Sequence, residues 1–431
     1  MGKKDNLGYY LYGGNFKSEG LTPNNDFYQN NLFFKTSYEF NNVNANFSLG
    51  YHQTTRQDGR DVTSDLNYSD DLEQLYSQLN INYKLDLQTE LSLHLKSSIH
   101  NSTFFLKQFS SGANLQVINI NDKNYIGSLI FSTKAVENHH LVAGLEVEEG
   151  DLKSDYINFG KRQLNKFSIF VNDTIKPFPK LTVTPGVRYD YVSVVDNFVS
   201  PSIGVVYNVM EDSLIRAYAS RGFGSPSLFQ LYGSGFFFLP NKNLMMEKVW
   251  AYQLGFETSK IPYLWVKTTL FLFDIEDMLR TVFLPGGFAI VVNKDNVKQQ
   301  GFELEFKTVP IKNFVLYGGF TLTDIRDSKT DEKIKGLPEY SVDLGLEYGE
   351  RDNYLITLRG KYVWWNEYGF YNGKYENFIF DLHGYKKLFK RKGYTLEAFG
   401  SIRNLFNSSY YAIDLFKNPQ RSLELGLKLF F

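Results

Sequence analysis

The side chains best suited to hold a ligand are aromatic, and most of them gather in one loop. Residues 231–240 contain Tyr232, Phe236, Phe237 and Phe238, and a second group, Tyr368 and Tyr371, follows later in the chain. Contiguous exposed aromatic rings mark recognition surfaces, because such rings stack on planar or apolar ligands. We therefore predict these side chains to be ligand contacts. Packing within the loop, or anchoring at an interface, is the alternative.

No catalytic constellation is visible, so the sequence does not predict an enzyme. There is no G-x-S-x-G motif, and no histidine lies near a candidate nucleophile in the sequence. Cysteine is absent, which excludes disulfides and thiolate metal sites. We expect no cofactor. Calcium stays open at a cluster of carboxylates without EF-hand spacing, and a solvated acidic loop is the alternative reading. The cluster comprises Asp58, Asp61, Asp65, Asp70 and Asp71.

The bulk composition narrows the class further. The net charge of −1 gives no basic footprint for nucleic acid, which we do not expect as a partner. Aromatic residues make up 17% of the chain, which is high for a soluble enzyme. No apolar run is long enough for a transmembrane helix. No break in composition divides residues 1–431, so we predict a single domain.

The elements that position these residues are predicted to be strands, because apolar residues recur with period two along most of the chain. The last strand is the clearest case: Leu423, Leu425, Leu427 and Leu429 alternate with polar or small residues. The predicted strands cover residues 7–17, 29–40, 45–56, 71–85, 88–104, 112–134, 140–153, 160–176, 180–194, 198–209, 213–222, 246–258, 262–275, 291–308, 312–326, 336–348, 353–365, 373–388, 393–404 and 419–431.

The connections alternate in length, since every second one is tight and most of the others are longer and more polar. Short turns on one side and long loops on the other are typical of a transmembrane antiparallel β-barrel. We therefore predict an all-β fold with an apolar face towards lipid and a polar face towards the lumen. The predicted lipid-facing set includes the four leucines above and Val342, Leu344, Leu346, Ile356 and Leu358. The predicted lumen set is Asp343, Glu347, Arg359, Lys361, Glu424 and Lys428.

Three segments resemble TonB-dependent outer-membrane receptors. In that family a strand ends in a Gly-Phe-Arg-Ala-Pro-like bend, an Asn-Pro-Asn-Leu-x-Pro-Glu box opens the next strand, and Asn-Leu-Phe-Asp-x-x-Tyr precedes the last strand. Lys242 and Met246 stand here where the box has its prolines. The matching residues, which we predict to be structural, are Gly222, Phe223, Pro226, Asn241, Asn243, Leu244, Glu247, Asn404, Leu405, Phe406, Tyr410, Arg421 and Phe431.

The resemblance implies a location in the bacterial outer membrane and a scarce external solute such as a siderophore, cobalamin or another metal chelate. The family barrel has 22 strands, and about twenty are readable here. Family members begin with a signal peptide, a TonB-contacting segment and a plug. None is visible here, so we expect the C-terminal barrel portion, with residues 2–6 as a turn before its third strand. Such a chain is not expected to support energised transport alone.

The resemblance also implies partners. These are outer-membrane lipid, the barrel assembly machinery through the C-terminal strand, and TonB only if a plug is supplied. Haem receptors of the family place a histidine between the first two motifs, and residues 224–242 contain none, which disfavours haem. A passive porin or structural barrel is the alternative function.

Overall fold

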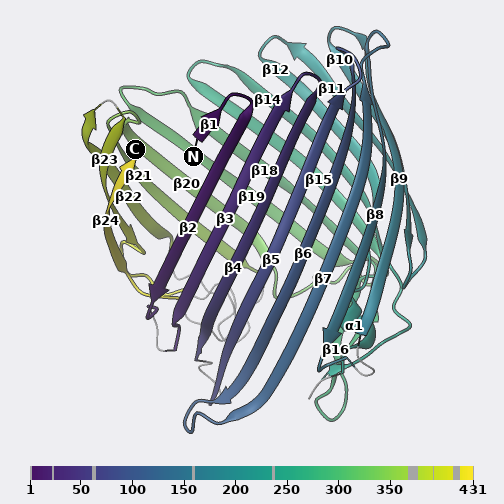
Figure 1. Cartoon of the computed structure of the whole chain (residues 1–431), viewed down its shortest axis with the longest axis vertical. Coiled ribbons are helices and arrows are strands. Elements are labelled where there is room, and N and C mark those ends of the chain that lie inside the picture. The colour runs from purple at the N-terminus through teal and green to yellow at the C-terminus, as the bar shows by residue number, and fades with distance from the viewer. Residues whose placement is uncertain are drawn as a thin grey trace. The chain divides into compact units, whose positions relative to one another are not determined.

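The chain is built almost entirely from β-strands. The computed structural model describes residues 2–21, 24–60, 65–157, 161–234, 238–366, 377–391, 393–410 and 418–430, to which all structural statements refer. Long strands follow one another along the chain, and one short helix interrupts them (Figure 1). None of the helical residues described forms a segment long and apolar enough to cross a membrane.

The elements have the following bounds. The first half of the chain contains β1 (Gly2–Lys4), β2 (Leu7–Ser18), β3 (Phe27–Phe40), β4 (Val43–Arg60), β5 (Leu66–Lys84), β6 (Thr89–Gln108), β7 (Asn114–Thr133), β8 (His139–Ser154), β9 (Lys161–Phe178), β10 (Leu181–Val192) and β11 (Asn197–Met210). The second half contains β12 (Ser213–Gly224), α1 (Leu228–Tyr232), β13 (Phe238–Leu239), β14 (Glu247–Ile261), β15 (Leu264–Glu276), β16 (Leu279–Phe283), β17 (Ala289–Asn293), β18 (Val297–Thr308), β19 (Phe314–Asp327), β20 (Pro338–Glu350), β21 (Tyr354–Trp365), β22 (Ile379–Arg391), β23 (Tyr394–Arg403) and β24 (Ser422–Phe430).

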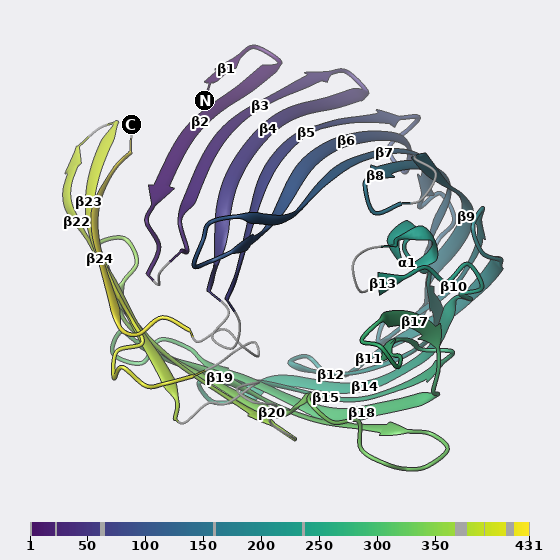
Figure 2. The same cartoon turned by 90° about the horizontal axis from the view of Figure 1, so that it is seen from below.

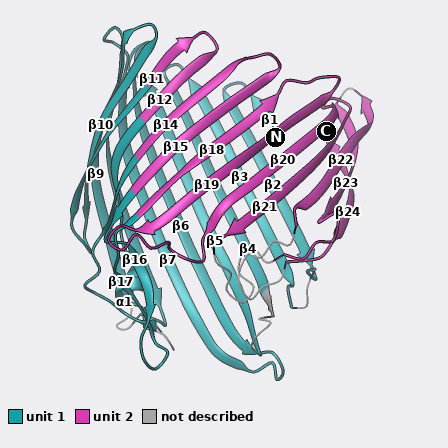
Figure 3. Cartoon of the chain, turned by 180° about the vertical axis from the view of Figure 1, so that it is seen from behind, with its two compact units in different colours: residues 1–205, 218–251, 274–297 teal, residues 206–217, 252–273, 298–431 magenta. Residues whose placement is uncertain are grey.

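Two compact units can be distinguished, and each is described by itself (Figure 3). Unit 1 comprises Met1–Val205, Tyr218–Ala251 and Asp274–Val297. Unit 2 comprises Val206–Ala217, Tyr252–Phe273 and Lys298–Phe431. In unit 1 strands β1 to β10 form a meander in which each strand pairs antiparallel with the next. In unit 2 strands β19 to β24 do the same.

The two faces of the unit 1 meander differ in chemistry. On one face Phe47, Leu79 and Leu95 lie side by side on β4, β5 and β6, as the strand registers require. On the opposite face of β8 and β10, Arg188 donates to Glu146 at 2.9 Å and to Asp190 at 2.8 Å. Side chains alternate between faces along a strand, so one pattern of residues builds both an apolar and a charged surface.

Unit 2 shows the same division on the residues predicted above. Leu346 lies opposite Leu358 on β21, and Asp343 lies opposite Lys361, so the apolar and charged pairs occupy different faces. On β24 the side chain of Leu425 is 73% exposed. Lys428 reaches Glu397 of β23 at 3.7 Å on the other face. The alternation predicted from the sequence is therefore present in this sheet.

Every range predicted to be a strand contains one, with three differences. The predicted strand at 291–308 is interrupted at Lys294–Asn296, where Asp295 adopts a φ of 74°. Residues 2–6 are not simply a turn, because Gly2–Lys4 forms β1 and pairs with β2. Four short elements were not predicted, namely α1, β13, β16 and the separate β17. They form a small assembly beside β9 and β10 (Figure 2).

Candidate functional site

The candidate site is the loop assembly, defined as the described residues of 226–246 together with 279–293, all in unit 1. Its framework is a three-stranded sheet in which β17 pairs in parallel with β13 and antiparallel with β16. The assembly is fastened to the end of β8, because the backbone N–H of Ser234 donates to the carbonyl of Tyr156 at 2.5 Å. A bridge between Ile157 and Gly233 adds a second link. This places α1 and β13 close to strands β8 and β9.

The Gly-Phe-Gly-Ser-Pro bend leads β12 into α1. The ring of Phe223 lies 5.0 Å from that of Phe198 on β11, and Pro226 is fully buried. Ser227 is the N-cap of α1: its hydroxyl accepts from the Gln230 N–H at 3.2 Å, and the Gln230 side chain accepts from the Ser227 N–H at 2.8 Å. This reciprocal capping satisfies two N–H groups that the helix leaves open.

The Asn241–Glu247 box is held by amide side chains. Asn241 Oδ1 accepts from the N–H of Asn243 at 3.1 Å, and its Nδ2 donates to the Val291 carbonyl at 2.9 Å. Asn293, at the end of β17, accepts from the Met245 N–H at 2.7 Å and donates to the Met245 carbonyl at 3.0 Å. Asn293 also donates to the carbonyl of Asp277 at 2.8 Å. One side chain therefore joins the box to both ends of the β16–β17 hairpin.

The box also supplies two small apolar cores. Leu244 packs with Leu231 and Val291, and these three residues are nearly inaccessible. Met246 packs with Val192 and Phe198 in the second core. The carboxylate of Glu247 accepts from the Leu279 N–H. The position at which the family box has a proline thus holds a buried methionine in this chain.

Aromatic rings and a guanidinium gather on the assembly. Phe229 of α1 stacks on Phe238 with centroids 5.1 Å apart, and its edge meets Tyr156 at 6.0 Å. The guanidinium of Arg162 lies 4.6 Å from the centroid of Tyr232, within the range of a cation–π contact. Burial raises the pKa of the Tyr156 hydroxyl. This group therefore brings aromatic rings and a positive charge together on the assembly.

A second arginine lies close to the same cores. Arg221 sits 5.0 Å from the ring of Phe198 and 5.8 Å from that of Trp250. Its Nε atom is buried, and the described residues supply no hydrogen-bond partner for it. Sequence reasoning missed Arg162, Arg221, Tyr156 and Asn293. The only available signal was that basic residues occur at strand ends beside the aromatic loop and that Asn293 ends an apolar run.

The amino-acid sequence matches a known protein family over nearly the whole chain. The sequence profile of the family described as "TonB dependent receptor-like, beta-barrel" matches residues 3–414. The chain belongs to this family. The family consists of transport receptors rather than enzymes, and it resides in the outer membrane of Gram-negative bacteria.

Individual relatives agree in fold. The Ferrienterobactin receptor of Escherichia coli (strain K12) is 22% identical over 243 residues, which cover 51% of this chain and 32% of that receptor. The chain therefore spans about a third of the length of this relative in the match. The siderophore receptor PirA from Pseudomonas aeruginosa has a TM-score of 0.76 at 15% identity, covering 100% of this chain and 74% of that one. The copper transporter OprC has a TM-score of 0.80 at 13% identity, covering 98% and 75%.

Because the chain belongs to the TonB-dependent receptor family, the two faces described above can be assigned to lipid and to the lumen. In a transmembrane antiparallel β-barrel the apolar face meets lipid and the polar face lines the lumen. Phe47, Leu79 and Leu95 thus face lipid, whereas Glu146 and Arg188 face the lumen. The longer loops lie outside the cell. The loop assembly comes directly after β12 and β15 in the chain, so it lies at the outer ends of these strands.

The third family motif forms a tight bend before β24 in unit 2. Asn404 is 3% exposed and has a φ of 52°, a left-handed conformation that asparagine tolerates. Its amide donates to the Ser408 carbonyl at 2.9 Å and accepts from the Ser408 N–H at 2.8 Å. Phe406 meets Phe380 edge-on at 5.5 Å, and the N–H of Leu405 donates to the Phe380 carbonyl.

The residues after this bend complete the motif. The N–H of Arg421 donates to Asn407 Oδ1 at 2.9 Å, which ties β24 to the bend. Burial, followed by the nearby Asp381 carboxylate, raises the pKa of the Tyr410 hydroxyl. The described residues of this third motif therefore form a folded bend that leads into β24.

Several predicted site residues lie outside the described residues, namely Phe236, Phe237, Tyr368, Tyr371 and Phe431. Asp61 of the acidic cluster does as well. Two other members of the cluster bond to protein groups: Asp70 accepts from Arg56 at 2.7 Å, and Asp65 from the N–H of Ser110 at 3.0 Å. Within the described parts of the chain, no three His, Cys, Asp or Glu side chains converge as metal ligands. His52 Nδ1 lies 2.6 Å from Asn31 Oδ1, so this histidine is held by a neighbouring strand.

Proposed function

We propose that this chain is the ligand-recognising barrel of an outer-membrane receptor for a ferric siderophore or a related metal chelate, and that residues 1–431 act as one barrel domain. The proposal rests on the cation–π contact between the Arg162 guanidinium and the Tyr232 ring, which lies beside the stacked rings of Phe229 and Phe238. Many ferric chelates combine flat aromatic rings with a net negative charge. Aromatic faces and a guanidinium complement both features. Two of the relatives, the Ferrienterobactin receptor and the siderophore receptor PirA, are receptors for ligands of this class, which supports the proposal.

The test is equilibrium binding of chelates to the purified barrel. A ferric catecholate chelate is the first probe, and cobalamin, which lacks catecholate rings, is the comparison ligand. Replacing Arg162 with Ala removes a cation–π contact and a counter-charge, so we expect catecholate affinity to fall about tenfold, or about 1.4 kcal/mol. Tyr232→Ala should have a similar effect. Arg351→Ala, in an exposed pair with Glu347 at the turn after β20, is the matched control.

Equal affinities for Arg162→Ala and Arg351→Ala would refute the proposed site. Tighter binding of cobalamin than of the catecholate would move the ligand class away from ferric chelates. A passive porin is disfavoured by the family match and by residues 222–241, which are nearly uncharged and so provide no facing charges for a constriction.

We further propose that these residues, expressed by themselves, bind ligand but do not drive energised uptake, because TonB must pull on a domain inside the barrel. The barrel assembly machinery would recognise the C-terminal strand Ser422–Phe430. Solute uptake in cells with and without TonB tests the first point. Uptake by the 431-residue polypeptide that stops when TonB is deleted would contradict it.

A further inference from the structure

The three-stranded sheet of the loop assembly has one apolar face. Its strand registers place Phe238 of β13, Ala289 of β17 and Phe283 of β16 in one row, and paired residues point to the same side of a sheet. Val291 follows on the same side, because side chains alternate along a strand, and it packs in a core with Leu231 of α1. This face therefore turns towards α1, which lies beside β13 and β17 (Figure 2).

Phe283 is the part of this face that stays open. It is 80% exposed, whereas Ala289 next to it is 9% exposed. On the other side of Ala289, Phe238 stacks on Phe229 of α1 with ring centroids 5.1 Å apart. Among the described residues, no aromatic ring contacts Phe283. The apolar face therefore ends in an uncovered ring that can stack on a further ring.

The spacing between the two flanking rings suits one inserted aromatic ring. Neighbouring strands lie about 4.8 Å apart, so Phe238 and Phe283, with one strand between them, start about 10 Å apart. Stacked aromatic rings have centroids about 4.5–7 Å apart, so a ring placed between these two would lie about 5 Å from each. The methyl group of Ala289 forms the floor and leaves the space above it open.

The tip of the β16–β17 hairpin is a closed turn. The N–H of Leu284 donates to the Phe288 carbonyl at 2.7 Å, and the N–H of Gly287 donates to the Leu284 carbonyl at 3.1 Å. Gly286 and Gly287 adopt φ values of 91° and 81°, which glycine tolerates without strain. Phe283 is therefore presented on a preformed hairpin, and less conformational entropy is lost when a ligand binds to it.

We propose that Phe238 and Phe283 form a slot for one aromatic ring of the ligand, with Ala289 as its floor. The receptor then prefers aryl chelates, such as catecholates, to aliphatic hydroxamate chelates. The slot adjoins α1, whose last residue, Tyr232, carries the Arg162 guanidinium over its ring. The inference rests on the proposed function and adds the chemical class of the chelate to it.

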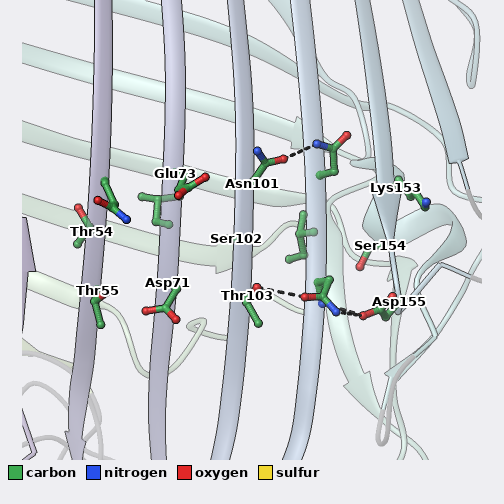
Figure 4. Close-up of a pocket in the computed structure, with 15 residues that line it drawn as sticks. Thr54, Thr55, Asp71, Glu73, Asn101, Ser102, Thr103, Lys153, Ser154 and Asp155 are labelled. Carbon is green, nitrogen blue, oxygen red and sulfur yellow. Dashed lines mark hydrogen bonds between the residues drawn. The ribbon is translucent and has the colours of Figure 1, made fainter. Parts of the chain in front are cut away.

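Unit 1 has a rival pocket of about 580 Å³, which lies on β4 to β8 (Figure 4). Its lining contains the carboxylates of Asp71, Glu73 and Asp155, one lysine, and no aromatic ring. Carboxylates repel an anionic chelate, and no ring is present there to stack on an aryl group. An aryl chelate therefore fits the slot of the loop assembly better than this pocket.

The experiment measures equilibrium binding of two iron chelates to the purified barrel by isothermal titration calorimetry. The probes are a ferric catecholate and ferric desferrioxamine, an aliphatic hydroxamate chelate. Phe283→Leu keeps an apolar side chain and removes the ring, so catecholate affinity should fall about fivefold while desferrioxamine affinity stays unchanged. Phe283→Trp keeps a ring and should retain wild-type affinity. Leu284→Ala, one residue further and on the opposite face, is the matched control.

Wild-type catecholate affinity in Phe283→Leu, or an equal loss of affinity for both chelates, would overturn the inference. Weaker catecholate binding in Asn101→Ala but not in Phe283→Leu would move the ring to the rival pocket. Arg162→Ala separates the slot from the proposed function. Lost affinity in Arg162→Ala with wild-type affinity in Phe283→Leu overturns the slot alone, whereas a wild-type barrel that binds neither chelate overturns both.

Discussion

Replacing Asn293 with Ala should release the Asn241–Glu247 box while leaving the sheet folded. The substitution removes three hydrogen bonds: from the Met245 N–H at 2.7 Å, to the Met245 carbonyl at 3.0 Å and to the Asp277 carbonyl at 2.8 Å. Three net contributions of about 1 kcal/mol would total about 3 kcal/mol. The two hydrogen bonds to Met245 are exposed, so water can bind the freed backbone groups and recover part of the lost stabilisation. We therefore expect the free energy of opening the box to fall by about 2 kcal/mol, which raises the population of the open box roughly thirtyfold.

Hydrogen exchange followed by mass spectrometry measures this opening directly. The peptide covering residues 241–250 should exchange roughly thirty times faster in Asn293→Ala, and peptides from β4 to β8 should be unchanged in the same sample. Asn293→Asp keeps the acceptor for the Met245 N–H and loses both donated bonds, so its exchange rate should be intermediate. Wild-type exchange of the box in Asn293→Ala would refute the view that this side chain holds the assembly together.

Three further predictions concern other parts of the barrel. Leu425→Arg should destabilise the folded barrel by about 2–4 kcal/mol if the residue lies near the membrane midplane, and Ser422→Arg on the opposite face by far less; equal losses in a bilayer refolding titration would contradict the two-face assignment. Hydrogen bonds from the N–H groups of Thr330 and Lys329 lower the pKa of Asp327, so this carboxylate stabilises its outer loop above the unfolded value of about 3.9, and the stabilisation is lost as pH falls through the lower folded-state pKa. A carboxyl ¹³C titration with a midpoint at or above about 3.9 would exclude this. Asn404→Ala loses both the amide bonds to Ser408 and the tolerance for a φ of 52°, whereas Asn404→Gly loses only the bonds; chemical denaturation should therefore rank wild type above Gly and Gly above Ala.

The strands could be predicted because their signal is local. Period-two alternation is written directly in the sequence, and each range predicted on this basis contains a strand. The interruption at Asp295 could not be predicted in this way. The apolar run that ends at Asn293 reads as part of a strand, but it pairs with β13 and β16 instead of continuing into β18.

The candidate site was less predictable because its contacts join distant segments. Arg162 lies at the start of β9, so most of that strand and all of β10, β11 and β12 separate it from Tyr232, and no periodicity relates the two residues. The capping box of α1 was visible in principle, since Ser227 and Gln230 have the required spacing. A helix of five residues, however, gives no periodic signal of its own. The family motifs located the bends correctly, but they did not reveal Asn293, which lies outside every motif.

The uninterrupted register between β5 and β6 limits how this hairpin can change in length. The two strands pair without a bulge from Lys84↔Glu90 to Leu66↔Gln108. Deleting one residue from the outer half of either strand would move every side chain between the deletion and the outer loop to the other face. Glu73 or Asn101 would then point into the lumen. Deleting two residues keeps each face intact and only shortens the projection beyond the membrane. Insertions and deletions in this hairpin among homologues should therefore occur in even numbers per strand.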